Sequence, residues 1–355
     1  MSGLFDPVRL GALDLRNRIV MTPMTRNRAD ADGAPGPMTA LYYAQRASAG
    51  LIITEGVHPC PSGQGYARTP GIHSETQVEA WGRVAAAVHA AGGRIVMQLM
   101  HCGRAALPEN QTPGAEIVAP SAVACDALLF GPDGVQRPCP KPRALETNEV
   151  RQVVEDYRQA ALNAMAAGMD GVELHAASGY LPMQFLSTNS NLRDDAYGGS
   201  TDNRCRFVVE VMEAMGEAIG HDRVGIRINP GSPYNGMADA VPAATYSTLL
   251  GALSGRGYAY VHLIYRPTRA LDTLMMTQGY WSGPLIVNDE LDAVRAASLL
   301  AGGGADAVSF GRPFIANPDL VARFAAGRPL SVPDRSTFYV GGEAGYTDYP
   351  CDAAS

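Results

Sequence analysis

The chain has 355 residues, a formal net charge of −7 and a pI near 5.5. This acidic balance argues against a nucleic-acid or anionic-membrane partner. No basic-then-apolar leader stands at the start, and no apolar run has membrane-spanning length. The six cysteines contain no Cys-x-x-Cys pair and the seven histidines lack metal-ligand spacing. We therefore expect a cytoplasmic protein with reduced thiols, no bound metal and ample length for a core.

Short apolar runs alternate with alanine-rich, helix-length stretches along the whole chain. Residues 1–16 predict a small hairpin, broken at Gly11, that plugs one end of the fold. Eight predicted strands follow, at 18–22, 51–55, 94–98, 171–174, 224–228, 259–263, 284–287 and 307–310. Predicted helices lie at 38–48, 76–91, 147–167, 201–218, 243–254, 290–301 and 317–326, whereas 264–283 gives only a weak helical signal.

Eight such β-then-helix units predict an α/β fold, a (β/α)₈ TIM barrel formed by residues 1–355 as a single domain. A doubly wound sheet would show a Gly-x-Gly-x-x-Gly turn after its first strand, and none follows Thr22. The segment 102–146 is too long, and too rich in Pro, Gly and Cys, for a simple loop. We interpret it as a capping excursion over the barrel mouth, inserted between the third strand and its helix.

Polar residues gather where these predicted strands end, which is where barrel enzymes carry their chemistry. The residues are Thr25, Gln98 with His101 and Arg104 just beyond, His175, Arg227, and the pair Gly311-Arg312. Burying a glutamine and an arginine inside a barrel mouth costs free energy unless a polar ligand forms hydrogen bonds with them. For Arg227 the alternative is an ion pair with an acidic residue on a neighbouring strand.

The stretch Gly171–Leu181 carries the strongest local signal. A short strand runs directly into a loop that holds an imidazole, a hydroxyl and a phenol, at His175, Ser178 and Tyr180. The alternative is that His175 satisfies a core hydrogen bond and Tyr180 packs in the core. The long polar loop that follows, from 185 to 204, is more than a core requires, and it favours an active site.

These motifs resemble the Old Yellow Enzyme family of FMN-dependent ene-reductases. The similarity covers nearly the whole chain, and Thr25, where other members have Cys, resembles the classical branch. The motifs are Pro23-Met-Thr-Arg26, Gln98-Leu-Met-His101, His175-x-x-Ser-Gly-Tyr-Leu181, Gln184-Phe-Leu-Ser187, Tyr197-Gly-Gly-Ser200, Ser309-Phe-Gly-Arg-Pro-Phe-Ile-Ala-Asn317, and a tail from Thr337-Phe-Tyr to Pro350.

The resemblance implies an oxidoreductase, monomeric or homodimeric, that uses FMN and NADPH or NADH to reduce the C=C bond of a small activated alkene. It implies that hydride passes from flavin N5 to the β-carbon, that Tyr180 protonates the α-carbon, and that His175, with Ser178 beside it, binds the activating oxygen. Cofactor-binding roles are implied for Pro23, Thr25, Gly56, Gln98, Arg227, Asn288, Gly311 and Arg312. Substrate-binding roles are implied for Tyr66, Met100, His175, Ser178 and Tyr346.

Three positions depart from the family pattern. Ser178 stands where a second His or an Asn is usual, Met100 where an aromatic residue is usual, and Asn288-Asp-Glu290 where a Gly-containing phosphate loop is usual. The two acids either repel a phosphate or belong to a helix cap, formed by Asn288 or Asp289, for a helix beginning near Glu290. Both readings leave fewer backbone amides for the phosphate, so we expect FMN to bind more weakly than is usual in the family.

The altered site leaves two alternatives open. One is a flavin-dependent desaturase, oxidase or isomerase in a specialised pathway. The other is a non-catalytic barrel that binds a ligand without flavin. The visible spectrum of the pure protein separates the last from the other two, and anaerobic mixing with NADPH and then cyclohexenone separates reduction from the rest.

Overall fold

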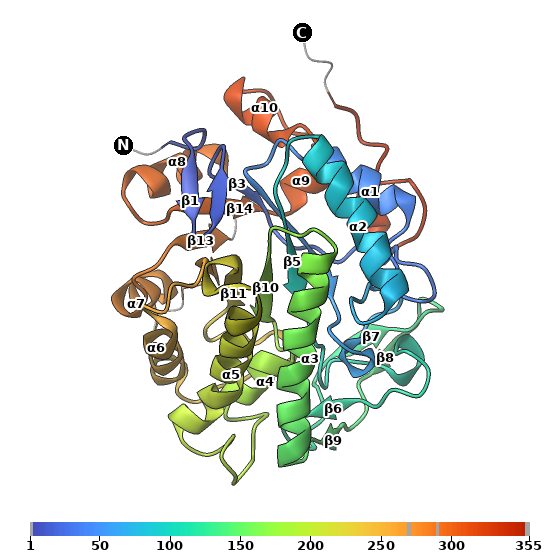
Figure 1. Cartoon of the computed structure of the whole chain (residues 1–355), viewed down its shortest axis with the longest axis vertical. Coiled ribbons are helices and arrows are strands. Elements are labelled where there is room, and N and C mark those ends of the chain that lie inside the picture. The colour runs from blue at the N-terminus through green and yellow to red at the C-terminus, as the bar shows by residue number, and fades with distance from the viewer. Residues whose placement is uncertain (1–2, 268–270, 289–290, 352–355) are drawn as a thin grey trace.

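The computed structural model describes residues 3–267, 271–288 and 291–351. Eight parallel strands close into a barrel in the order β10-β11-β12-β13-β14-β3-β4-β5, with helices around it (Figure 1). The strands are β3 (Ile19–Met21), β4 (Leu51–Val57), β5 (Ile95–Leu99), β10 (Gly171–Ala176), β11 (Val224–Ile228), β12 (Tyr260–Ile264), β13 (Leu285–Asn288) and β14 (Ala307–Phe310). The predicted TIM barrel is therefore confirmed, strand by strand.

The helices follow the predicted ranges closely, with three additions. They are α1 (Pro37–Ala44), α2 (Glu75–Ala90), α3 (Thr147–Ala166), α5 (Thr201–Ile219), α6 (Pro242–Leu253), α8 (Ala293–Ala301) and α10 (Leu320–Ala325). The additions are α4 (Leu181–Leu186), α7 (Thr273–Tyr280) in the weakly helical stretch, and α9 (Arg312–Ala316). No helix in the described ranges is long and apolar enough to cross a membrane.

The start of α8 corrects one prediction. Asp292 caps this helix, because its carboxylate accepts a hydrogen bond from the Arg295 backbone N–H at 2.8 Å. The predicted cap at Asn288 or Asp289 is therefore wrong. Asp289 and Glu290 themselves lie outside the described residues. The prediction that their charges affect phosphate binding therefore stays a prediction.

An N-terminal hairpin closes the bottom of the barrel, as predicted. Strands β1 (Val8–Leu10) and β2 (Leu13–Leu15) pair antiparallel around Gly11. Gly11 has a φ of 57°, and a Cβ there would lie 2.2 Å from the Asp222 carbonyl oxygen, so only glycine fits this approach. The three buried leucines of the hairpin pack against the apolar end of the barrel interior.

The inner face of the barrel is apolar at the bottom and polar towards the top. Side chains two residues apart on a strand point the same way. The residues Val20, Val96, Ile286 and Ala307 join the hairpin's apolar cluster. Two residues further along the same strands stand Thr22, Gln98, Asn288 and Ser309. The polar layer therefore lies at the end of the barrel where the strands finish.

The segment 102–146 leaves the barrel after β5 and returns at α3. It contains a hairpin of β7 (Leu128–Phe130) with β8 (Gln136–Pro138) and a short ladder of β6 (Val118–Ala119) with β9 (Arg143–Ala144). Its buried residues Leu107, Cys125 and Leu129 pack in one cluster with Met100 and Tyr180. This contact places part of the segment beside the ends of β5 and β10.

A glycine inside the barrel gives a test of this packing. Gly225 is paired with Tyr260 in the sheet, and a Cβ at position 225 would lie 2.4 Å from the buried Tyr260 ring. We expect Gly225→Ala to lower the free energy of unfolding by roughly 1–3 kcal/mol, the usual cost of overpacking a core. Denaturant unfolding of both proteins measures the difference.

Gly251→Ala is the matched control, because Gly251 lies within α6 and a Cβ there would meet nothing within 4 Å. It should leave stability unchanged or raise it by up to about 1 kcal/mol. Equal unfolding midpoints for Gly225→Ala and the parent protein would contradict the packing described for the barrel interior.

Candidate active site

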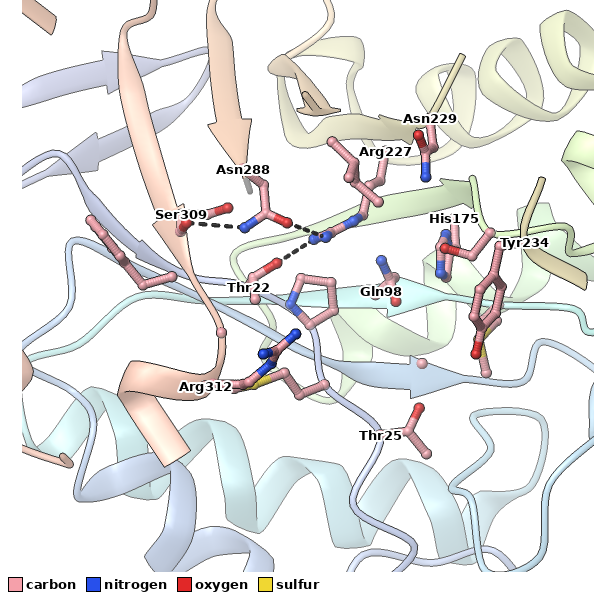
Figure 2. Close-up of a pocket in the computed structure, with 18 of the residues that line it drawn as sticks. Thr22, Thr25, Gln98, His175, Arg227, Asn229, Tyr234, Asn288, Ser309 and Arg312 are labelled. Carbon is pink, nitrogen blue, oxygen red and sulfur yellow. Dashed lines mark hydrogen bonds between the residues drawn. The ribbon is translucent and has the colours of Figure 1, made fainter. Parts of the chain in front are cut away.

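A cavity of about 560 Å³ opens at the carboxyl ends of the strands. Figure 2 shows how side chains from several strands converge on it. Every residue predicted to hold the cofactor lines this cavity: Pro23, Thr25, Gly56, Gln98, Arg227, Asn288, Gly311 and Arg312. His175, Ser178, Tyr180 and Met100 line it as well.

Arg227 is the buried cation of the site, with 6% of its surface exposed. Its guanidinium donates hydrogen bonds to Thr22 Oγ1 and, at 2.8 Å, to Asn288 Oδ1 (Figure 2). Asn288 in turn donates to the backbone carbonyl of Ser309 at 3.0 Å. Neutral acceptors on β13 and just past the end of β3 thus hold the guanidinium in a fixed orientation, which offsets part of the cost of burying it.

His175 and Tyr180 lie side by side on one wall of the cavity. Each has 7% of its surface exposed, and their rings meet edge to face with centroids 4.9 Å apart. Nδ1 of His175 has no hydrogen-bond partner in the described part of the chain. The hydroxyl of Tyr180 donates to the hydroxyl of Tyr66 at 3.1 Å. The imidazole and the phenol both line the cavity, where a ligand would meet them together.

Burial sets the protonation state of both groups. It lowers the pKa of His175 well below its ordinary value, and the nearby Arg227 and His262 lower it further. It raises the pKa of Tyr180 well above its ordinary value, with the Tyr66 phenol adding to the effect. At neutral pH the cavity thus presents a neutral imidazole and a phenol that keeps its proton.

The loop between these residues turns through two left-handed residues. Ser178 has a φ of 56° and Gly179 a φ of 73°. The Ser178 carbonyl accepts a hydrogen bond from Asn235 Nδ2 at 2.9 Å, which holds the turn. Left-handed backbone is uncommon for serine and much more common for asparagine. The turn brings Ser178 to the cavity and leaves Tyr180 as the N-cap residue of α4.

Met100 packs directly against Gly56 in the wall of the cavity. The methionine is buried, and a Cβ on Gly56 would lie 2.5 Å from its sulfur. Position 56 therefore needs a glycine, because any larger side chain would occupy the space that the Met100 thioether fills. A methionine has three rotatable bonds and a flexible shape, so this wall can adapt to different ligands more easily than an aromatic ring would.

Gly311 and Arg312 form the turn between β14 and α9. A Cβ at position 311 would lie 2.9 Å from the Thr22 side chain, so glycine is required for the turn to pass the first strand. Arg312 follows as the first residue of α9 and lines the cavity. A glycine that admits close backbone approach, followed by a guanidinium, suits a phosphate group.

Tyr346 is placed differently from its prediction. It is fully buried, outside the cavity lining, and its ring stacks on that of Tyr42 at 4.1 Å beneath the Arg28 guanidinium. The same tail reaches the cavity at Phe338 and Tyr339 instead. Phe338 and Tyr339 both belong to the tail motif that resembles the family, so the sequence could have indicated them as site residues. Tyr66 contacts Tyr180 rather than the cavity itself.

Several lining residues were assigned no role from the sequence. Among them are Thr22, Asn229 and Tyr234, and also Ser309, although Ser309 begins a motif that carries the resemblance. His101 and Arg104, expected near the mouth, are buried beside it and outside the lining. His101 Nδ1 accepts from the Gly103 backbone N–H at 3.1 Å, and Arg104 donates to the Gly236 carbonyl at 3.1 Å. Among the described residues, no group of three or more His, Cys, Asp or Glu could hold a metal ion.

The fold and the cavity together define a (β/α)₈-barrel enzyme with a buried polar edge and a cationic, glycine-containing turn at its mouth. Residues 3–331 match the family of NADH:flavin oxidoreductases and NADH oxidases. The chain belongs to this family, which includes the Old Yellow Enzymes, so the resemblance found in the sequence is confirmed at the level of the family.

Known members are similar over almost the full chain. A probable flavin mononucleotide-dependent alkene reductase from Leishmania infantum is 42% identical, across 98% of this chain and 97% of that protein. The structure of morphinone reductase in complex with tetrahydroNAD is 47% identical with a TM-score of 0.94, across 99% of this chain and 98% of that one. The old yellow enzyme homologue from Zymomonas mobilis is 40% identical with a TM-score of 0.95, across 98% and 99%.

The buried His101 predicts a pH dependence of stability. Burial lowers its pKa in the folded protein to about 3, whereas an unfolded histidine takes up a proton near pH 6.5. The unfolded state therefore binds more protons below pH 6.5, and stability is lost as the pH falls. At pH 5 this residue should cost about 2 kcal/mol relative to pH 7.

His101→Asn checks this, because Asn Oδ1 can still accept from the Gly103 N–H but does not titrate. Denaturant unfolding at pH 7 and pH 5 should show a difference smaller by about 2 kcal/mol in the variant than in the parent protein. The other titrating groups are common to both proteins and cancel in this comparison. Identical differences in the two proteins would show that His101 is charged in the folded state.

Proposed function

We propose that this protein is an FMN-dependent ene-reductase that reduces the C=C bond of small, electron-poor alkenes. The observation that carries the proposal is the pairing of a neutral His175 with a protonated Tyr180 on one wall of the cavity. The neutral imidazole can bind a carbonyl oxygen without changing its protonation state, and the phenol can donate a proton to carbon. Membership of the flavin oxidoreductase family supports the same reaction.

The chemistry of the cavity fits FMN. Its volume lies within the usual range for cofactor pockets, and it combines buried polar groups at one end with a cationic turn at the other. Gln98 and Arg227 would hold the pyrimidine edge, and Gly311 with Arg312 the phosphate. Thr25 would contact flavin O4, with Pro23, Gly56 and Asn288 completing the pocket. FMN, once reduced by NADPH or NADH, supplies the hydride that the reaction needs.

In this proposal His175 donates a hydrogen bond to the carbonyl oxygen of the substrate and stabilises the negative charge that develops there. Tyr180 delivers its proton to the α-carbon. The hydroxyl of Tyr66, 3.1 Å from that of Tyr180, can return a proton to it. Arg227 stabilises the negative charge of the reduced cofactor. For His175, Tyr180 and Tyr66, burial already favours the uncharged form that the role needs.

Two features favour a substrate bulkier than cyclohexenone. Ser178 and Met100 are, respectively, shorter and more flexible than the residues usual at their positions. At the rim, Tyr234 and Tyr339 are 59% and 61% exposed and offer aromatic surface to a ligand at the entrance. We further propose that the whole chain forms one domain, with 102–146 capping the cavity through its contacts with Met100 and Tyr180.

The test of this function is a two-step anaerobic experiment. NADPH or NADH should bleach the flavin absorbance of the purified protein, and cyclohexenone should restore it. Tyr180→Phe should slow the second step by about 10²–10⁴-fold, the usual contribution of a general acid, and leave the first nearly intact. Stopped-flow absorbance measures both steps separately.

Tyr246→Phe is the control, since it removes another buried phenol hydroxyl, on α6 and outside the cavity lining. It should leave both steps unchanged. Equal rates of enone reduction in Tyr180→Phe and the parent protein would remove Tyr180 from the mechanism. A purified protein that shows no change in flavin absorbance when FMN is added would overturn the proposed function as a whole.

Ser178 provides a second prediction. A serine hydroxyl stands on a shorter stem than the nitrogen donor of His or Asn, so it falls short of a substrate oxygen bound by His175. The left-handed backbone at this position suits asparagine. We expect Ser178→Asn to raise the rate of cyclohexenone reduction, since one missing oxyanion donor can cost on the order of 10²–10³-fold. Flavin reduction by NADPH should not change.

Ser178→Ala separates the missing donor from other effects. If the serine hydroxyl contributes little, this variant should match the parent protein with cyclohexenone. A rate for Ser178→Asn that is flat or lower than the parent rate would show that the missing donor does not limit turnover. The site would then have to be explained by a substrate that is not a simple enone.

A further inference from the structure

A buried carboxylate lies beneath the proposed cofactor site, and none of the roles above uses it. Glu173 on β10 and His262 on β12 are both fully buried inside the barrel, on either side of β11. Glu173 Oε1 accepts a hydrogen bond from Gln98 Nε2 at 2.8 Å, and Oε2 lies 2.8 Å from His262 Nδ1. His262 Nε2 lies 2.8 Å from Ser309 Oγ.

We propose that Glu173 is a positioning residue that sets the direction of the hydrogen bonds made by Gln98 and His262. It orients the Gln98 amide with its carbonyl oxygen towards the cofactor, and it holds His262 as the Nδ1–H tautomer. This inference rests on the proposed function only where it concerns the cofactor. The direction of the hydrogen bonds is a property of the protein alone.

The position of Arg227 requires a neutral His262. One guanidinium nitrogen of Arg227 lies 3.4 and 3.3 Å from the two ring nitrogens of His262. Burial, with this neighbouring cation, lowers the pKa of His262 to about 4. A neutral imidazole carries one proton, and besides the guanidinium, which can only donate, its ring nitrogens face a carboxylate and a hydroxyl.

The carboxylate decides where that proton lies. A carboxylate can only accept hydrogen bonds, whereas a hydroxyl can donate or accept. The proton therefore stays on Nδ1 and faces Glu173, and Nε2 accepts from the Ser309 hydroxyl. Gln98 obeys the same constraint, because its NH₂ group must face Glu173. Its carbonyl oxygen is then the end left for the cavity, where it can accept from the N3–H of a flavin.

Glu173→Gln would break this arrangement in a defined way. Gln98 and His262 each face a different oxygen of Glu173, and an amide in the same place puts its oxygen at one of these positions and its NH₂ group at the other. It can therefore accept from Gln98 or from His262 but not from both. If it keeps the bond to Gln98, the His262 proton must move to Nε2. If it keeps the bond to His262, the Gln98 amide must reverse and present NH₂ to the N3–H of the flavin.

Nuclear magnetic resonance of protein containing ¹⁵N-labelled histidine reads the tautomer directly, with and without FMN. The signal of His262 is assigned by its absence in His262→Gln. We expect the parent protein to show Nδ1–H with an acceptor Nε2. Glu173→Gln should show either Nε2–H or an unchanged tautomer with FMN bound about tenfold more weakly, because two donors then face each other.

Ser309→Ala is the matched variant, and it keeps the test decisive if Glu173→Gln fails to fold. It removes the hydroxyl partner but leaves Glu173, so His262 should remain Nδ1–H. The proposal is overturned if the parent protein shows Nε2–H, if Ser309→Ala changes the tautomer, or if Glu173→Gln alters neither tautomer nor FMN affinity. A protein that binds no FMN would defeat the proposed function, while the tautomer in the flavin-free protein would still test Glu173.

Discussion

The structure depends on burying one guanidinium inside the barrel. Arg227 stands near the carboxyl end of β11 and is buried, so an uncompensated charge there would cost several kcal/mol. Thr22, just past β3, and Asn288 on β13 hydrogen-bond to it, and the His262 ring on β12 lies against it. At the level below, the inward-facing strand residues are apolar and the hairpin covers them. The cation thereby stands at the polar layer above an apolar lower half.

A second group of buried arginines ties the C-terminal tail to the same mouth. Arg26 donates to the Gly345 carbonyl at 2.7 Å and Arg28 to the Gly342 carbonyl at 3.0 Å, while the Arg28 guanidinium lies 4.4 Å from the Tyr346 ring centre. Contacts between a cation and an aromatic face strengthen when both are desolvated. The tail is therefore anchored by a stack behind the cavity wall, and that anchor brings Phe338 and Tyr339 to the rim.

The barrel could be predicted from the sequence because each strand is a short apolar run with its polar residue at the carboxyl end, a local pattern. Arg227 and Gln98 were found in this way. Tyr346 was misplaced because its partner Tyr42 lies about 300 residues earlier, and only the fold brings the two rings together. Glu173 was overlooked for a similar reason. A strand residue gives no sign of whether it faces the barrel interior until its partners His262 and Gln98 are known.

Burial acts in two ways on neighbouring groups of the cavity. It encloses a permanent cation, Arg227, which favours negative charge nearby. It also keeps His175, which pairs with Arg227 in the sheet, neutral and Tyr180 protonated. A reaction that moves a hydride and then a proton to an alkene needs both a fixed cation and uncharged partners for the substrate, because negative charge first stands on the hydride donor and then on the substrate oxygen. A cationic His175 would bind the oxygen more strongly in the ground state as well, and would gain less in the transition state. The same low polarity of the surroundings that makes Arg227 costly to bury therefore keeps the neighbouring imidazole and phenol uncharged.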